Sequence, residues 1–273
     1  MKLSVSNIAW AAEHDCEIYE YLSEIGYSGL EIAPTRIFPV TPYEKPVEAR
    51  HFSDKLGERY QLEISSMQSI WYGVSESLFG LESERRALVE YTKKAIDFAH
   101  VVNCGNLVFG CPKNRVIPDG MSSDEYLPVA YDFFRAIGDY AAEKGTCIAI
   151  EANPPIYNTN FINTTAQALE LCKELNNPGI KVNIDMGTMI HNNENIKLIT
   201  DNICLVNHVH LSEPHLMPVE KRQVHGELME ALKHVNYAKY LSVEMSNTGD
   251  INAVKSAIFY VREIAKGRCE NDD

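Results

Sequence analysis

Short apolar segments recur along this chain, and stretches with helical spacing separate them. The apolar segments lie near residues 2–8, 29–33, 62–68, 105–110, 147–152, 180–185, 204–210 and 240–245. The stretches between them repeat apolar residues every three or four positions, as at Leu88, Tyr91, Ala95, Phe98 and Val102, which is typical of an amphipathic helix. Strands and helices that alternate eight times predict an α/β protein whose parallel sheet closes into a (β/α)8 TIM barrel.

Capping residues mark several boundaries of the expected helices. Thr164 and Gln167 form the pattern of a capping box, Asp250 can cap the last helix, and Gly145 stands where a helix ends in a left-handed residue. Pro128 lies inside the region expected for the fourth helix. Because proline lacks an amide proton, we expect that helix either to begin at Pro128 or to bend there.

The length of the chain agrees with one barrel. A TIM barrel takes about 250 residues, and no segment rich in Pro, Gly or Ser divides the 273 residues, so we expect a single (β/α)8 domain over residues 1–273. An open, doubly wound sheet is the alternative. The chain has no GxGxxG after its first apolar segment and no GxxxxGK[ST], which are the phosphate-binding loops of common open-sheet nucleotide binders.

Composition excludes several classes of partner. The net charge of −13 and the absence of Lys or Arg runs argue against nucleic acid and anionic membranes. No segment has the length and apolar character of a membrane helix or a signal peptide, so we expect a soluble, cytoplasmic protein. Seven scattered cysteines without a CxxC pair indicate reduced thiols. The sequence leaves the oligomeric state open, and both a monomer and a homo-oligomer agree with it.

Four residues able to bind a metal each stand at the C-terminal end of an apolar segment. Glu151 ends CIAIE, Asp185 ends IKVNID, His210 ends ICLVNHVH and Glu244 ends YLSVE. A charged group at the end of a buried parallel strand is unfavourable unless something uses it. Since the C-terminal ends of barrel strands form the active-site mouth, we expect these four residues, the strand-end cluster, to meet in one site.

The donor types of the strand-end cluster indicate the kind of metal. Three carboxylates and one imidazole suit Mn²⁺ in an octahedral shell, with Mg²⁺ or Co²⁺ as alternatives and Zn²⁺ less favoured. Each residue could instead cap a strand on its own. Three carboxylates that converge without a cation would repel one another and take up protons, so a bound divalent ion is the simpler interpretation.

The motif HVHLSEP and the later VEM resemble the metal-ligand strands of the xylose isomerase-like TIM barrel family, whose nearest branch is that of the ketohexose 3-epimerases. The resemblance implies that the strand-end cluster holds one divalent ion. It also implies an isomerase or epimerase of a sugar, a sugar phosphate or a related polyhydroxy ketone that moves a proton next to a carbonyl, with Glu151 and Glu244 as acid and base on opposite sides of the substrate.

The chain departs from that branch at three positions. Thr188 replaces a substrate-binding His, Tyr157 replaces a Glu, and Leu216 stands where an Arg is expected. These changes make a free ketohexose doubtful as the substrate. Endonuclease IV, another member of the family, needs further histidines where this chain reads SMQS, FGCP and DMGT, so DNA repair is not expected.

Further polar and aromatic residues are candidates for contact with a carbohydrate. Sugars favour sites with an aromatic face and a few amide or charged partners, and a cationic pair after the fourth strand could hold a phosphate or carboxylate. Ordinary packing, core hydrogen bonding or a solvated loop is the alternative for each of them. The candidates are Gln68, Trp10, Asn153, His208, Glu213, Lys113, Arg115 and His225.

Two other functions remain open from the sequence. A dehydratase acting on an inosose-like or dehydroshikimate-like substrate would begin with the same proton removal and would use the same ligands. A barrel that binds without catalysis, or that acts only with a partner subunit, would also keep them.

Overall fold

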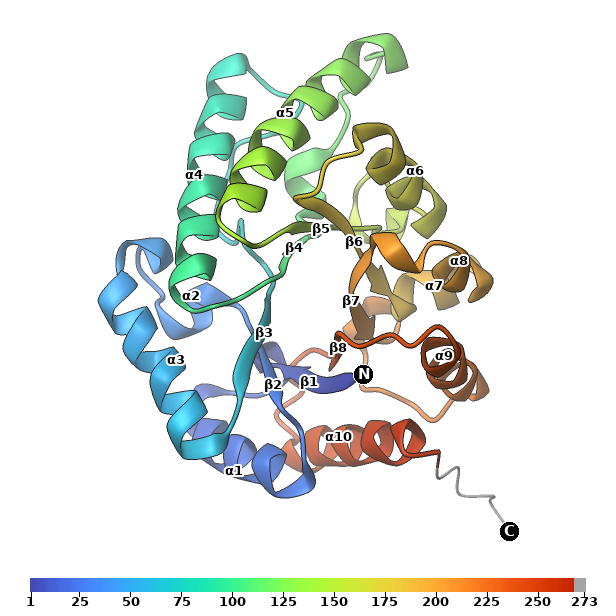
Figure 1. Ribbon diagram of the computed structural model, residues 1–273. Helices are drawn as coiled ribbons and strands as arrows, with labels where there is room; N and C mark the ends of the chain where they lie inside the picture. Colours follow the sequence, from blue (N-terminus) through green and yellow to red (C-terminus); the bar gives the residue numbers. More distant parts are fainter. Residues whose placement is uncertain (268–273) are drawn as a thin grey trace.

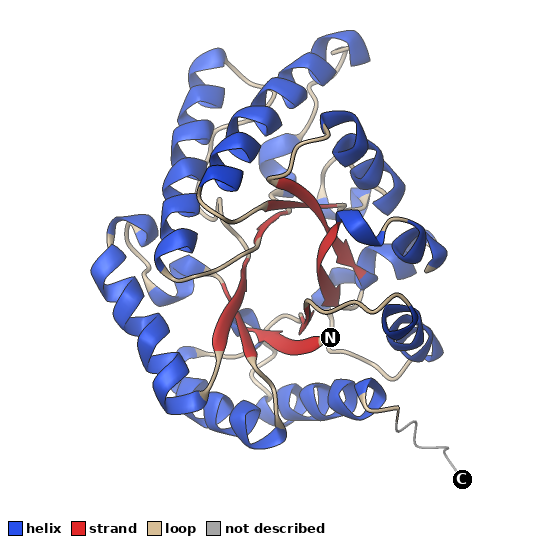
Figure 2. Cartoon of the chain, in the orientation of Figure 1, coloured by secondary structure: helices blue, strands red, loops and turns tan. Residues whose placement is uncertain are grey.

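The computed structural model describes residues 1–267. Eight parallel strands close into a barrel in chain order, with the first strand paired to the last, and the helices form a ring outside them (Figures 1 and 2). The predicted TIM barrel is confirmed, and the open sheet is excluded. The strands are β1 (Lys2–Ser6), β2 (Gly29–Ile32), β3 (Glu63–Met67), β4 (Leu107–Phe109), β5 (Ile148–Glu151), β6 (Ile180–Asp185), β7 (Val206–Leu211) and β8 (Tyr240–Val243).

The helices follow the strands as the apolar spacing predicts, with short additional helices in the loops. They are α1 (Asp15–Ile25), α2 (Pro34–Ile37), α3 (Pro46–Tyr60), α4 (Glu82–Val101), α5 (Ser123–Glu143), α6 (Thr165–Leu175), α7 (Met186–Asn192), α8 (Lys197–Asp201), α9 (Gln223–His234) and α10 (Ile251–Ala265). A single domain across residues 1–273 stays a prediction. Among residues 1–267, no helix has the length and apolar character needed to cross a membrane.

The predicted helix boundaries hold except at the proline. The capping box at Thr164 forms, and Asp250 accepts main-chain N–H groups at the start of α10. Gly145 has φ +75°. Helix α5 continues through Pro128 and therefore does not begin there; a bend at Pro128 stays a prediction. A second capping box, in which the amide of Ser122 donates to the carboxylate of Glu125 at 2.7 Å, starts the helix earlier, so Pro128 removes only one main-chain hydrogen bond from an established helix.

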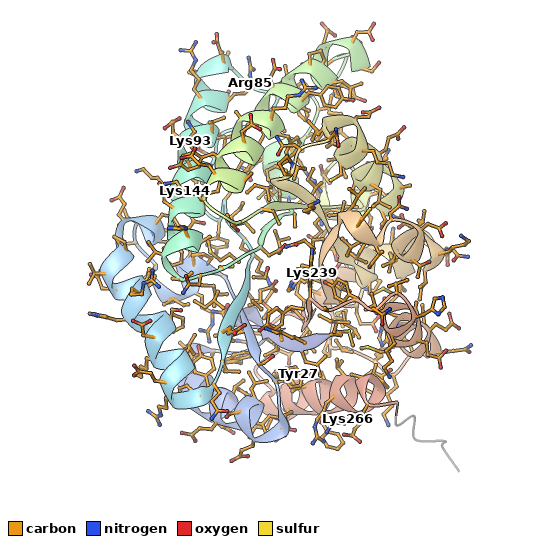
Figure 3. The ribbon with its side chains drawn as sticks, viewed as in Figure 1. Tyr27, Arg85, Lys93, Lys144, Lys239 and Lys266 are labelled. Atoms are coloured by element: carbon orange, nitrogen blue, oxygen red, sulfur yellow. The ribbon has the colours of Figure 1, made fainter. Side chains whose placement is uncertain are left out.

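The inside of the barrel holds an unusual number of polar side chains. Side chains fill the space within the ring of strands (Figure 3), and register places polar residues of neighbouring strands side by side. Ser6 pairs with Glu31, Glu31 with Ser66, and His210 with Ser242, and all of these residues are fully buried. Buried polar groups need hydrogen-bond partners, so this layer is a network and not a hydrocarbon core.

The described cysteines, six in number, carry free thiols. Cys269 lies outside the described residues.

Candidate metal centre

The barrel brings the strand-end cluster together. One ligand atom from each of Glu151, Asp185, His210 and Glu244 lies within 4.8 Å of all the others. Glu151 and Asp185 end β5 and β6, His210 stands one residue before the end of β7, and Glu244 directly follows β8. Their exposed fractions are 9, 7, 0 and 6%, so the carboxylates are buried but retain a little contact with solvent.

The spacing within the cluster fits one divalent ion. Nδ1 of His210 lies 3.0 Å from Oε1 of Glu151 and 3.1 Å from Oε2 of Glu244. Ligands bound at about 2.1 Å to an octahedral ion are separated by about 3.0 Å at neighbouring corners. The donor set of oxygens and one imidazole nitrogen suits the same type of ion. The cluster can therefore hold a divalent metal.

The electrostatics of the cluster also favour a cation. Burial raises the pKa of Asp185 to about 6, and the charge of Glu151 adds to this effect. Burial likewise raises the pKa of Glu244 to about 7. Burial opposes a charge on His210, but the carboxylates of Glu244, Glu31 and Glu151 raise its pKa well above the usual value. Without an ion, the site takes up protons that a divalent metal would replace.

Glu151 is held by amide groups. Asn183 donates to its Oε1 at 2.6 Å, and Asn153 donates to its Oε2 at 3.0 Å. Behind them, Arg115 donates to the carbonyl of Glu151 at 2.9 Å and to Oδ1 of Asn153 at 2.7 Å. Burial disfavours the charged carboxylate, but His210 and these amides outweigh it and lower the pKa of Glu151. For the carboxylate of Glu244, the one hydrogen-bond or ion-pair partner among the described residues is His210.

Asp185 is oriented by the turn that follows β6. The amide of Thr188 donates to its Oδ1 at 2.6 Å, and the hydroxyl of Ser212 donates to its Oδ2. The turn is tight, because a Cβ on Gly187 would lie 2.8 Å from the carbonyl oxygen of Glu213. Glycine is therefore required for this approach of the two loops.

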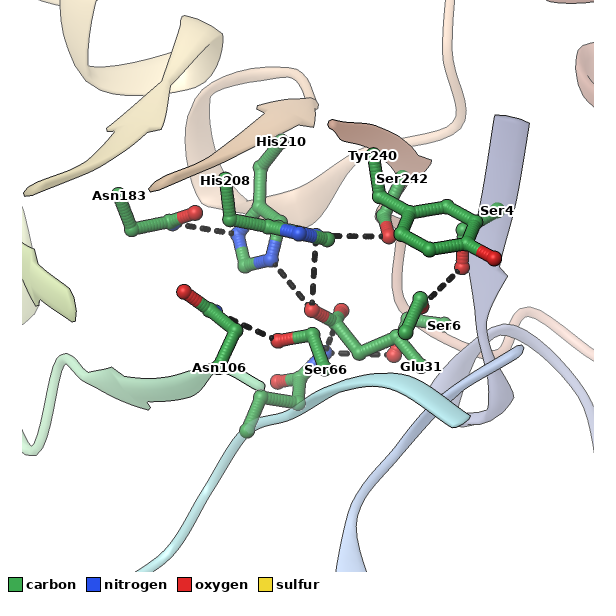
Figure 4. A network of polar contacts seen from close by, with 12 residues as sticks. Ser4, Ser6, Glu31, Ser66, Asn106, Asn183, His208, His210, Tyr240 and Ser242 are labelled. Atoms are coloured by element: carbon green, nitrogen blue, oxygen red, sulfur yellow. Dashed lines mark hydrogen bonds and ion pairs between the residues drawn. The ribbon is translucent and has the colours of Figure 1, made fainter. Parts of the chain in front are cut away.

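Glu31 is a site residue that sequence reasoning missed. It lies within β2, has no exposed surface, and places its Oε2 2.8 Å from Nε2 of His210 (Figure 4). Asn183 was also missed, although it contacts both Glu151 and His210. The reasoning that located the strand-end cluster could also have identified Glu31, because Glu31 is a charged residue in a strand that is buried along its whole length.

A model of the xylose isomerase-like TIM barrel family matches residues 19–264. The chain belongs to this family. No curated protein matches the sequence significantly.

Solved structures agree with the family fold. 3-Keto-D-glucoside 4-epimerase from E. coli is 20% identical with a TM-score of 0.78, covering 96% of this chain and 99% of that one. D-Psicose 3-epimerase from Clostridium cellulolyticum H10, with D-tagatose, is 13% identical with a TM-score of 0.79, covering 97% and 99%. A probable 3-DHS dehydratase from Bacillus anthracis is 15% identical with a TM-score of 0.71, covering 98% and 100%. At these identities the likeness shows the shared fold.

Three of the predicted substrate-binding residues lie beside the strand-end cluster but already have protein partners. Asn153 contacts Glu151 as described above. Gln68 donates to Ser6 at 2.5 Å and to Glu31 at 3.1 Å. Nε2 of His208 lies 2.8 Å from the hydroxyl of Ser242, so His208 belongs to the polar interior. Contact of these residues with a substrate stays a prediction.

Arg115, predicted to hold a substrate anion, is turned into the protein interior, and that role stays a prediction. This side chain has no exposed surface, and it uses its Nη2 for the two protein acceptors beside Glu151. Burial lowers its pKa to about 10. Lys113 is exposed in the loop after β4. The cationic pair is thus split between the interior and the surface.

The remaining candidates are also committed to the protein. Trp10 is 2% exposed, and its indole N–H donates to Asp15 at 2.8 Å. Glu213 is 2% exposed; Nε of Arg222 lies 2.8 Å from both of its carboxylate oxygens, and Nη2 lies 2.7 Å from Oε2. His225 has no exposed surface; its Nδ1 lies 3.4 Å from the hydroxyl of Tyr260, and its Nε2 has no hydrogen-bond partner among the described residues. Trp10 and Glu213 lie in the loops after β1 and β7, and His225 lies in α9. Contact of these buried side chains with a substrate stays a prediction.

The positions that depart from the ketohexose epimerases have structural partners here. The hydroxyl of Thr188 donates to the carbonyl of Ala152 at 2.9 Å, which joins the loops after β6 and β5. Tyr157 accepts the amide N–H of His215 at 2.8 Å. Leu216 has φ +53°, a strained value for this residue type.

Proposed function

We propose that this protein is a divalent-metal-dependent isomerase or epimerase of a sugar or a related polyhydroxy ketone, with Mn²⁺ as the metal. The observation that carries the proposal is the strand-end cluster, in which two glutamates flank one histidine at 3.0 and 3.1 Å. Two of the three solved structures named above are carbohydrate epimerases, which agrees with it.

The bound ion would polarise a substrate carbonyl and stabilise the negative charge that develops when the neighbouring carbon loses its proton. Glu151 is suited to accept that proton, because amide donors keep its carboxylate ionised. Glu244 lies on the other side of His210 from Glu151, 3.1 Å from Nδ1, and is placed to return the proton to the same carbon from another side.

The surroundings of the cluster favour an uncharged substrate. Arg115, the cation expected to bind a phosphate, has no exposed surface. Its Nη2 donates to the carbonyl of Glu151 and to Asn153, while its buried Nε and Nη1 have no hydrogen-bond partner among the described residues. We therefore propose that the substrate is a neutral polyhydroxy carbonyl compound and not a sugar phosphate.

Solvent deuterium exchange tests the function. The protein with Mn²⁺ in D₂O is incubated with ketoses, keto-inositols and their phosphates, and mass spectrometry measures the gain of one deuterium. We expect incorporation that EDTA abolishes and that Glu151→Gln and Glu244→Gln each reduce by about 10²-fold or more. Glu143→Gln, at the exposed end of α5, is the matched control and should keep full exchange.

The outcomes separate the alternatives. If no compound of the panel exchanges, the proposed function fails. A product lighter by one water, with ultraviolet absorbance from a new conjugated double bond, would instead show the dehydratase. Exchange that is confined to phosphates would contradict the uncharged substrate.

A further inference from the structure

Glu31 contacts the strand-end cluster through His210, the only histidine of the cluster, on the side away from the carboxylates. The two ring nitrogens of His210 face opposite groups: Nδ1 faces the carboxylates of Glu151 and Glu244, and Nε2 lies 2.8 Å from Oε2 of Glu31 (Figure 4). Glu31 comes from β2, on which the sequence placed no ligand. Its carboxylate is thus a partner of the ligand and does not belong to the strand-end cluster.

We propose that Glu31 is a positioning residue for the metal, an inference that rests on the proposed metal centre. By accepting the proton of Nε2, Glu31 fixes the tautomer of His210, so that Nδ1 is free of a proton and directed at the cluster. A carboxylate that accepts the distal N–H of a histidine ligand also increases the basicity of the coordinating nitrogen. Sequence position gives no hint of this link, because 179 residues separate the two partners.

The carboxylate of Glu31 is itself held in place. Gln68 donates to Oε1 at 3.1 Å, and Nε2 of His208 lies 3.3 Å from Oε2. Glu31 and both histidines are at most 1% exposed. A buried carboxylate without partners is strongly unfavourable, so these contacts restrict Glu31 to one orientation. His210 therefore meets a fixed acceptor.

A second metal ion is the rival interpretation of the same residues. Glu31, His208 and His210 also offer ligand atoms within 4.8 Å of one another. However, Nε2 of His208 lies 2.8 Å from the hydroxyl of Ser242, and Gln68 serves the other oxygen of Glu31. Hydrogen bonds already account for these groups, and the contacts favour one ion with a supporting carboxylate.

Calorimetric titration of the metal-free protein with Mn²⁺ tests the proposal. Glu31→Gln keeps the size of the side chain and an acceptor atom but removes the charge, and we expect the Kd for Mn²⁺ to rise 10- to 100-fold. The matched control is Ser66→Ala, since Ser66 is the fully buried register neighbour of Glu31 and accepts a hydrogen bond from Asn106 at 2.9 Å. Its Kd should stay within about threefold of that of the unaltered protein.

The proposal is overturned if Glu31→Gln binds Mn²⁺ within threefold of the unaltered protein, if Ser66→Ala weakens binding equally, or if two ions bind. If Glu31→Gln does not fold, ¹⁵N NMR of the histidines in the unaltered protein loaded with Zn²⁺ tests the proposal instead, because it shows which ring nitrogen of His210 is protonated. A protonated Nε2 and a coordinated Nδ1 on His210 support the assignment, and the reverse pattern refutes it.

The same titration separates this inference from the proposed function. If the unaltered protein binds no metal, both fail. If metal binds as proposed but no deuterium enters any substrate, the function fails and the role of Glu31 stands.

Discussion

Replacing Asp185 by asparagine should stabilise the metal-free protein and at the same time remove its response to metal. Burial and the charge of Glu151 raise the pKa of Asp185 from an ordinary 3.8 to about 6. A carboxyl group whose pKa is raised by folding contributes full stability below the unfolded value and loses it as pH rises through the folded value. The difference of about 2 pKa units corresponds to up to about 3 kcal/mol of destabilisation above pH 6.

Asparagine fits the site in shape and hydrogen bonding. Its carbonyl can accept the amide of Thr188, and its NH₂ group can donate to the hydroxyl of Ser212, which already accepts the amide of Gly187 at 2.9 Å and has a second lone pair. At pH 8 in EDTA, Asp185→Asn should therefore unfold at a higher temperature than the unaltered protein. At about 2 °C per kcal/mol for a chain of this size, the gain is up to about 6 °C.

Calorimetric unfolding with and without Mn²⁺ provides the comparison. Mn²⁺ at 100 times its Kd should stabilise the unaltered protein by about 2.7 kcal/mol and should leave Asp185→Asn nearly unchanged. At pH 4.5 in EDTA, the advantage of the variant should shrink to about 1 kcal/mol, because Asp185 is then mostly protonated in the folded protein. A variant that is less stable than the unaltered protein in EDTA at pH 8 would refute the reasoning.

Three further predictions concern parts of the fold around the site. Burial lowers the pKa of His225 to about 4, so the unaltered protein should lose about 3 kcal/mol of stability as the pH falls from about 6.5 to 4. In urea unfolding, His225→Gln should lose less stability over this pH range. Equal losses in the two proteins would contradict the lowered pKa of His225. Gly187→Ala places a Cβ 2.8 Å from the carbonyl oxygen of Glu213 and should cost about 1–3 kcal/mol and weaken Mn²⁺ binding. Gly226→Ala in α9, where a Cβ meets nothing within 4 Å, is its control and should stabilise by about 0.5–1 kcal/mol. Thr164→Ala removes the cap of α6 and should lower the unfolding free energy by about 1 kcal/mol, whereas an unchanged midpoint would show that the capping box contributes nothing.

Sequence reasoning located the strand-end cluster because its argument needs only local information. A carboxylate at the end of a buried apolar segment is unfavourable wherever it occurs, and parallel strands bring all such ends to one side of the sheet. The sequence could not show that Arg115 is buried, since a cation in a loop near the mouth has the same local sequence whether it faces solvent or turns inward. Its Nη2 donates to the carbonyl of Glu151, at the end of β5, and to Asn153, which follows that strand.

The sequence by itself determined the eightfold alternation of strand and helix and the four residues at or next to the ends of strands β5 to β8, because periodicity and polarity are properties of neighbouring residues. Only the tertiary structure decided that Glu31 stands behind His210 and that Asn183 holds Glu151. These contacts join residues of different strands, and strand register and barrel closure set their distances. The order of residues along the chain carries the pattern of the barrel, while the contacts across its interior exist only once the barrel has closed.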